Sequence, residues 1–161
     1  MVTIDGLITH LRPPKASKHQ GAPSLLCYTS WMGEFNVLGG ELEPCGTDPL
    51  TGFYRNGCCS TGPEDLGSHT ICAVVTADFL EHQRNIGNDL VTPAPQYRFP
   101  GLIPGDRWCV TAANWFRAHH DGAAAYVVLA STHERVLDIV PLAVLQEHAV
   151  DIPEGPDYLT G

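Results

Sequence analysis

Lysine is almost absent from the chain, and the two lysines that occur lie near one end. They are Lys15 and Lys18 in a sequence of 161 residues, whose formal net charge at pH 7 is −9. An acidic, lysine-free body fits nucleic acid poorly, because binding to a phosphate backbone depends on clustered cations. It also excludes Schiff-base chemistry and a lysine-dependent phosphate loop in that body. We therefore expect no nucleic-acid partner.

Long apolar runs are missing too. No segment approaches the ~20 apolar residues of a membrane-spanning helix, so we expect no membrane partner. The first ten residues lack the basic stretch and long apolar stretch of a secretory signal. These absences favour a cytoplasmic protein. In that reducing compartment the six cysteines are expected to be thiols, metal ligands or catalytic groups, and not disulfides.

The chain does contain enough apolar material for one folded domain. Hydrophobic residues make up 43% of it and charged residues 17%, which is typical of a globular protein. Residues 1–34 include Pro13-Pro14 and both lysines but show no periodicity, so we predict a poorly ordered N-terminal tail. A single globular domain is placed at 35–151 and a C-terminal tail at 152–161.

The pattern inside the domain predicts an α+β fold. Helices are expected at 77–86, where Thr76 is the cap, at 112–120, and after Pro141. Strands are expected at 70–75, 107–110, 126–130 and 136–140, with brief ones at 35–38 and 53–55. Turn formers fill 39–67, and prolines mark 88–106 as irregular. The prediction is a small mixed or antiparallel sheet with about three helices and long ordered loops.

Cysteine and histidine gather between residues 45 and 72. Cys45, Cys58 and Cys59 lie in turn-rich loops, and His69 precedes the strand expected at 70–75. Thiolates and imidazole together suit zinc, so Cys45, Cys58, Cys59 and His69 are candidate ligands of a bound zinc ion. The segment has no C-x₂-C knuckle. Successive residues of a strand point to opposite faces, so His69 and Cys72 would face opposite ways if both were in the strand. The two can serve one site only if His69 lies in the preceding loop.

Two other interpretations stay open for the same residues. In a thiol-dependent enzyme or redox protein acting on a small molecule, Cys58 or Cys59 is the catalytic nucleophile. His69 is then its base, and Asp65 or Glu64 orients the imidazole. In a non-catalytic partner-binding module the cysteines only pack, as free cysteine commonly does.

Several residues near these candidates are expected to have ordinary roles. Cys72 and Cys109 have strand-like apolar neighbours and fit the core. His133 is expected in an exposed turn, and His148 on the surface of a helix. Cys27 belongs to the predicted tail and enters no site.

Short ordered strings across residues 35–151 carry a family resemblance. They include Thr47-Asp-Pro-Leu-Thr-Gly-Phe53, Gly57-Cys-Cys59, Gly67-Ser-His-Thr70, Pro104-Gly-Asp-Arg-Trp-Cys109 and Thr132-His-Glu134. In these strings the chain resembles the bacterial family called domain of unknown function 2237, which implies no particular activity. The family pattern often reads Trp-Cys-Leu-Cys where this chain has Trp108-Cys-Val-Thr111. Threonine is a poor ligand for a soft metal ion, which counts against a shared all-thiolate centre.

Overall fold

Three short strands form an antiparallel sheet at the centre of the fold. The computed structural model describes Cys27 and residues 33–152, and its strands are β1 (Ile71–Val74), β2 (Arg107–Val110) and β3 (Tyr126–Val127). Their order in the sheet is β2-β1-β3. Cys72 of β1 lies opposite Cys109 of β2. The predicted α+β class is confirmed, and the sheet is the antiparallel one of the two forms expected.

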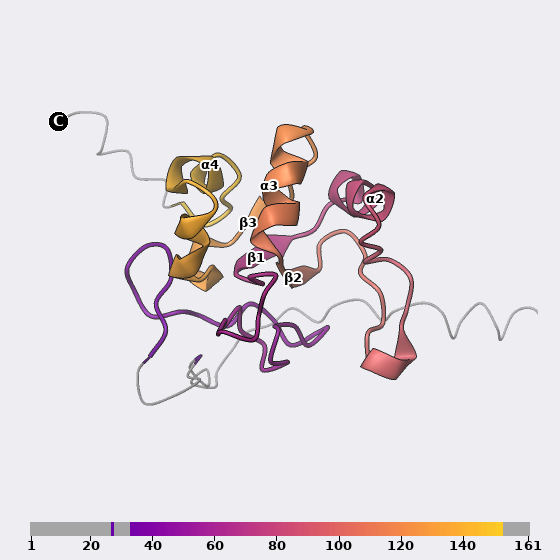
Figure 1. The fold of residues 1–161 in the computed structure, drawn as a ribbon, viewed down its shortest axis with the longest axis horizontal. Helices are drawn as coiled ribbons and strands as arrows, with labels where there is room; N and C mark the ends of the chain where they lie inside the picture. Colours follow the sequence, from indigo (N-terminus) through magenta and orange to yellow (C-terminus); the bar gives the residue numbers. More distant parts are fainter. Residues whose placement is uncertain (1–26, 28–32, 153–161) are drawn as a thin grey trace, which may run out of the picture.

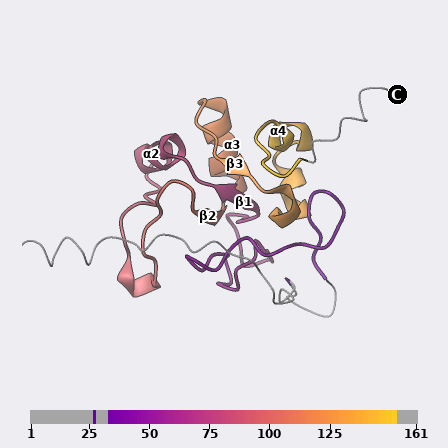
Figure 2. The ribbon, with the colours of Figure 1, turned by 180° about the vertical axis from the view of Figure 1, so that it is seen from behind.

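Three α-helices cover one face of this sheet. They are α2 (Ala77–Asn85), α3 (Ala112–His120) and α4 (Leu142–Glu147). Figures 1 and 2 show all three on the same side of the strands, while the loops of residues 33–70 lie on the other side. The Thr76 side chain accepts a hydrogen bond from the amide of Phe79 at 3.1 Å, so the expected cap of α2 is present. The fold therefore has a helix layer, a thin sheet and a loop layer.

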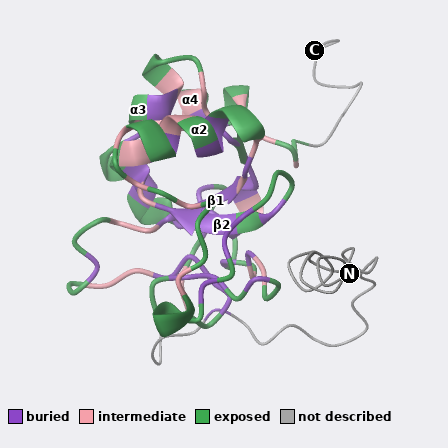
Figure 3. Cartoon of the chain, turned by 90° about the vertical axis from the view of Figure 1, so that its right-hand side faces the viewer, coloured by how far each residue is buried: buried purple, intermediate pink, exposed green. Residues whose placement is uncertain are grey.

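The alternation of strand side chains assigns each residue to one of these layers. Ile71, Ala73, Trp108 and Val110 belong to the large apolar core that includes α2 and α3. Cys72 and Cys109 belong to a separate buried cluster on the other face. Successive side chains of a strand point to opposite faces, which explains the division. Figure 3 shows the buried strands between the helices above and the loops below.

The segment after β3 differs from the sequence prediction. The strand expected at 126–130 ends at Val127 and gives way to a 3₁₀ turn, Leu129–Ser131. The strand expected at 136–140 is wrong, because a 3₁₀ helix spans Glu134–Asp138. Val136 and Val140 are both fully buried, and the Val140 amide donates to the Val136 carbonyl. That four-residue spacing is helical, and it outweighs the strand preference of the valines.

The brief strands expected early in the domain are reduced to isolated contacts. Phe35 pairs only with Glu41, and Asn36 only with His133. Residues 53–55 form turns. The rest of 33–70 is irregular chain held by turns, and Pro95–Tyr97 forms a 3₁₀ helix within the proline-marked segment.

The two predicted tails lie largely outside the described residues. Of the first 34 residues the structure describes Cys27 and the two before Phe35, and of the last ten it describes Ile152. Cys27 is buried beside Leu42 and Cys58. Within the part of the chain that the structure describes, no helix is both long and apolar enough to span a membrane.

Candidate functional site

Four cysteines meet on the loop face of the sheet. Cys72 and Cys109 are cross-strand neighbours, and Cys45 and Cys59 approach them from the loop layer; all four are at most 2% exposed. Val128 completes this sulfur cluster, with Val74 packed at its edge. Two strands and two loop segments distant in sequence thus supply one buried group of side chains.

The sheet places Cys72 and Cys109 directly opposite each other. The Cys72 amide donates to the Thr132 hydroxyl oxygen at 3.1 Å, and the Cys109 amide donates to that of Thr51 at 2.8 Å. Neither amide bonds across to the other strand, so the two cysteines form a non-hydrogen-bonded pair, in which opposing side chains are closest. The same threonine hydroxyls satisfy amides that would otherwise be buried without a partner.

Glycine conformations hold the loop cysteines against the sheet. The Cys45 amide donates to the Gly57 carbonyl at 2.8 Å, and Gly57 has a φ of 85°. Gly52 has a φ of 102°, and a Cβ there would collide with the Cys58 carbonyl. Positive φ and close backbone approach both favour glycine. The glycines of this turn-rich segment therefore help to position Cys45 and Cys58.

The expectation of free thiols is corrected by the structure. The disulfides are Cys27–Cys58, Cys45–Cys72 and Cys59–Cys109, and none of the six cysteines is free. A sulfur in a disulfide is neither a thiolate ligand nor a nucleophile. In this form the candidate ligands and nucleophiles Cys45, Cys58 and Cys59 are therefore masked. The core positions expected for Cys72 and Cys109 are found, but both are paired.

Cys58 and Cys59 diverge although they are adjacent in sequence. Cys58 packs with Cys27 and Leu42, whereas Cys59 lies in the sulfur cluster. Cys45, Cys59 and Cys109 have their sulfur atoms within 4.8 Å of one another. That distance limit fits three ligands of one ion, and Cys58 is not in the group. Cys59 therefore lies in a group of sulfurs that fits one ion, whereas Cys58 does not.

His69 lies in the loop before β1, but its partner is a carboxylate and not a sulfur. Its Nδ1 is 2.6 Å from Oδ1 of Asp65, and its backbone amide donates to Oδ2 of Asp65 at 2.8 Å. The Asp65 side chain is fully buried, while that of His69 is 34% exposed. Asp65 thus orients the imidazole, as the sequence suggested for a general base. Among the described residues, the sulfur group that fits one ion does not include His69.

One buried histidine was missed by the sequence reasoning. His133 is only 6% exposed, not in an exposed turn. Its Nδ1 accepts a hydrogen bond from the Arg135 amide at 3.0 Å, and its Nε2 is 3.3 Å from Oε1 of Glu34. Burial alone raises the pKa of Glu34, but hydrogen bonds from His133, Ser60 and the Thr61 backbone, together with the charge of His133, outweigh it, and the pKa is lowered. The early position of Glu34 gave no sequence signal for this contact.

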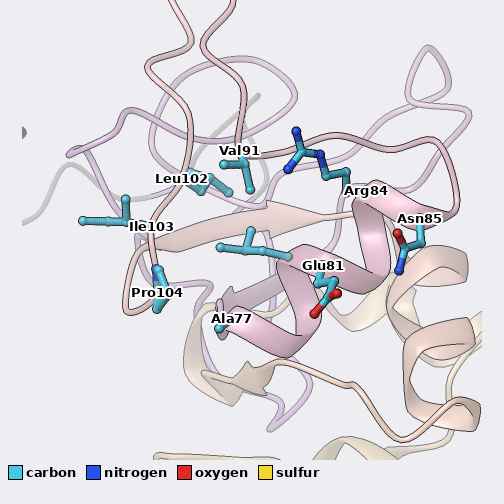
Figure 4. A pocket seen from close by; sticks show the side chains of 9 residues that line it. Ala77, Glu81, Arg84, Asn85, Val91, Leu102, Ile103 and Pro104 are labelled. Carbon is cyan, nitrogen blue, oxygen red and sulfur yellow. The ribbon is translucent and has the colours of Figure 1, made fainter. Parts of the chain in front are cut away.

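A groove on the helix side of the sheet lies apart from all these residues. It encloses about 510 Å³ between α2 and the chain around Val91 and Ile103. Figure 4 shows Leu102 on the side of the groove opposite α2, with the Arg84 side chain extending from α2 near Val91. No residue that the sequence singled out as a candidate lines it.

A comparison with protein families extends over nearly all of this structure. The family model described as "Uncharacterized protein conserved in bacteria (DUF2237)" matches residues 35–149. The chain belongs to this family. The resemblance seen in the sequence is thereby confirmed. A search of curated proteins finds no significant match.

Five of the six cysteines lie within the residues that the DUF2237 model matches, and one precedes them. Cys45, Cys59, Cys72 and Cys109 lie within the matched residues, and so does Cys58, whereas Cys27 precedes them. The Cys27–Cys58 disulfide therefore ties the DUF2237 domain to the segment before it. The sulfur cluster, in contrast, is built entirely within the domain.

Proposed function

We propose that this DUF2237 domain, in a reducing compartment such as the cytoplasm, binds one zinc ion in its sulfur cluster. Cys45, Cys59 and Cys109 are the first three ligands and Cys72 is the fourth. The observation that carries the proposal is the approach of three sulfurs, from three segments of the chain, to within 4.8 Å of one another. Zinc with four thiolates is a common structural site in reducing compartments.

The spacing of the sulfurs suits a tetrahedral ion. With Zn–S bonds of about 2.3 Å, ligand sulfurs are about 3.8 Å apart, within the 4.8 Å limit of the three sulfurs. Cys72 is not in that group of three, but it is bonded to Cys45 in the oxidised form, so its sulfur lies beside one member of the group. Reduction followed by small side-chain rotations would open each bonded pair to ligand distance, without moving the strands.

Burial decides what kind of site this would be. Each of the four cysteines is at most 2% exposed, so four thiolates would enclose the ion and leave no position for water or substrate. Closed coordination of this kind is structural, whereas catalytic zinc keeps an open position. The ion would hold the loop layer on the sheet, as the disulfides do in the oxidised form. It would also compensate for burying thiolate charge, which is costly without a partner.

The proposal changes the ligand set expected from the sequence. Cys45 and Cys59 remain, Cys58 and His69 are replaced, and Cys72 and Cys109 enter. Thr111 is not part of this set. It occupies the N-cap position of α3 without a side-chain capping bond, and its methyl carbon lies 3.0 Å from where a Cβ on Gly67 would be. Threonine in place of the family cysteine therefore removes no ligand here.

The decisive experiment compares two neighbouring cysteines. Tag-free protein would be reduced with a phosphine under argon, loaded with Zn²⁺, desalted and analysed for metal. We expect the wild type and Cys58→Ala each to bind about one equivalent more than Cys59→Ala does. Binding of less than about a tenth of an equivalent by the reduced wild type would refute the proposal. Equal loss in both variants would also refute it, because Cys58 lies outside the cluster.

Cobalt substitution identifies the ligand atoms. Co²⁺ bound by thiolates gives intense sulfur-to-metal charge-transfer absorption, which imidazole and carboxylate ligands do not give. We expect these bands in the reduced wild type and in Cys58→Ala. They should be strongly weakened in Cys59→Ala and Cys109→Ala. A wild-type complex without the bands would place the ion elsewhere on the chain.

A redox role is the second candidate, and the same proximity favours it. Cys45 lies within 4.8 Å of both sulfurs of the Cys59–Cys109 disulfide. If an external dithiol reduces Cys45–Cys72, the Cys45 thiolate can attack the Cys59 sulfur. A Cys45–Cys59 bond forms and Cys109 leaves as a thiolate. Disulfide mapping across graded ratios of dithiol to disulfide tests this, because a Cys45–Cys59 species supports exchange and its absence counts against it.

A further inference from the structure

Two histidines and a glutamate meet where α3 and α4 end. His119 is next to last in α3, Glu147 is the last residue of α4, and His148 is the residue after it. Nδ1 of His119 is 3.0 Å from Nε2 of His148. One ligand atom from each of the three residues lies within 4.8 Å of the other two. This imidazole cluster is on the helix side of the sheet, opposite the sulfur cluster.

Trp115 holds both imidazoles in place. It is fully buried, and its indole N–H donates to the Ala125 carbonyl at 3.0 Å. The His119 ring stacks on it at 5.9 Å between centroids and 10° between planes, and the His148 ring meets it edge-on at 5.4 Å. The backbone carbonyl of His148 also accepts a hydrogen bond from the Val127 amide. The histidines are therefore preorganised by the core and do not depend on an ion for their placement.

We propose that His119, Glu147 and His148 bind a divalent transition-metal ion, with zinc as the reference ion. Tetrahedral zinc with bonds of about 2.0–2.1 Å places two ligand nitrogens about 3.3 Å apart, close to the 3.0 Å of the two histidines. Both helices end at the cluster, and the negative ends of their dipoles favour a cation. Glu147 forms no ion pair within the described part of the chain, so its carboxylate is available.

The exposure of the cluster distinguishes it from the sulfur site. Glu147 is exposed and both histidines are partly exposed. Three protein ligands leave one tetrahedral position, and solvent can reach it. Two histidines, a glutamate and a water are the ligand set of an open zinc site, in which the ion exchanges and can activate water or bind a small anionic ligand. The ordinary alternative is a histidine–histidine hydrogen bond that only packs against Trp115.

The test uses oxidised protein, so that the disulfides keep the sulfurs out of the measurement. Zinc would be titrated calorimetrically into tag-free wild type, His119→Gln, Glu147→Gln and the matched control His120→Gln. His120 is exposed, adjacent to His119 and outside the cluster. We expect one site in the wild type and in His120→Gln, and at least tenfold weaker binding in the other two. Even residues that only orient a metal ligand typically contribute tenfold or more.

Each outcome decides for or against the imidazole cluster alone. Glu147 is on the surface, so Glu147→Gln keeps the test valid if His119→Gln folds poorly. Wild type that binds no more tightly than Glu147→Gln would overturn the proposal, as would equal weakening by His120→Gln. The sulfur site would remain open in either case, because it is measured only in reduced protein. Conversely, loss of zinc from reduced Cys59→Ala would leave the imidazole cluster untouched.

Discussion

The Cys59–Cys109 disulfide gives the sharpest prediction about stability. The two residues are 50 apart in sequence, and closing a loop of that length lowers the entropy of the unfolded chain. The chain-entropy relation gives about 4 kcal/mol at room temperature. We therefore expect oxidised Cys59→Ala/Cys109→Ala protein to lose about 4 kcal/mol of unfolding free energy. The small cavities left by two buried sulfurs should add about 1–2 kcal/mol, for a total loss of about 5–6 kcal/mol.

Urea denaturation separates these two contributions. Without the Cys59–Cys109 cross-link the denatured chain is less compact, so the m-value of the oxidised double variant should be higher than that of the wild type. A cavity alone would lower the midpoint and leave m unchanged. With a reductant present, the wild type also lacks the cross-link. The difference between the two proteins should then shrink to the cavity contribution.

Two outcomes would refute this reasoning. A loss below about 1 kcal/mol in the oxidised pair would mean that the cross-link contributes little to stability in solution. An equal loss with and without reductant would assign the whole effect to packing.

Adding Zn²⁺ to the reduced wild type extends the test to the proposed zinc site in the sulfur cluster. At a free zinc concentration of 100 times the dissociation constant, stability should rise by about 2.7 kcal/mol, and the double variant should gain much less.

Four further substitutions test the positioning of the sites. Gly52→Ala should destabilise by at least about 2 kcal/mol in thermal or urea unfolding, because its positive φ and the Cys58 carbonyl leave no room for a Cβ. The lowered pKa of Glu34 adds stability above its unfolded pKa that is lost as the pH falls through the folded pKa, so Glu34→Gln should flatten the acid limb of the stability profile. A conservative His133→Gln should flatten it as well. Trp115→Phe should cost about 1–3 kcal/mol by calorimetry, because a buried carbonyl loses its indole donor.

The elements around the sheet could be predicted because their signals are local. Thr76 caps α2 through its own side chain, and the predicted limits of β2 and α3 match the observed ones. Each signal lies within a few residues of the element it determines. The prediction at 136–140 failed where two local signals conflicted. The valines favoured a strand, but their four-residue spacing followed a helix.

The cysteine pairing could not be predicted from local signals. Six cysteines allow 15 pairings, and sequence spacing does not choose among them. The choice of a reducing compartment pointed to thiols, whereas the disulfides join each strand cysteine to a loop cysteine, Cys72 to Cys45 and Cys109 to Cys59. Cys72 looked like core because its neighbours are apolar. The same apolar surroundings place it against Cys109, which makes it part of the sulfur cluster.

His133 was misjudged for a related reason. It follows a short turn segment whose polar neighbours indicate exposure. Its imidazole instead contacts Glu34, a residue far away in sequence. Sequence reasoning succeeded for His69, whose partner Asp65 is only four residues away. Separation along the chain, and not residue type, decided which contacts were found.

The thin sheet separates the two proposed metal sites. On one face the strand alternation gathers buried sulfurs, and on the other the helix ends gather partly exposed imidazoles and a carboxylate. A closed thiolate site suits a permanent structural ion, and an open imidazole site suits an exchanging one. Oxidation would abolish the first and leave the second intact. A domain with both sites would thus keep its exchangeable ion when its structural ion is replaced by disulfides. Zinc binding measured separately in oxidised and reduced protein is therefore the comparison that resolves the two.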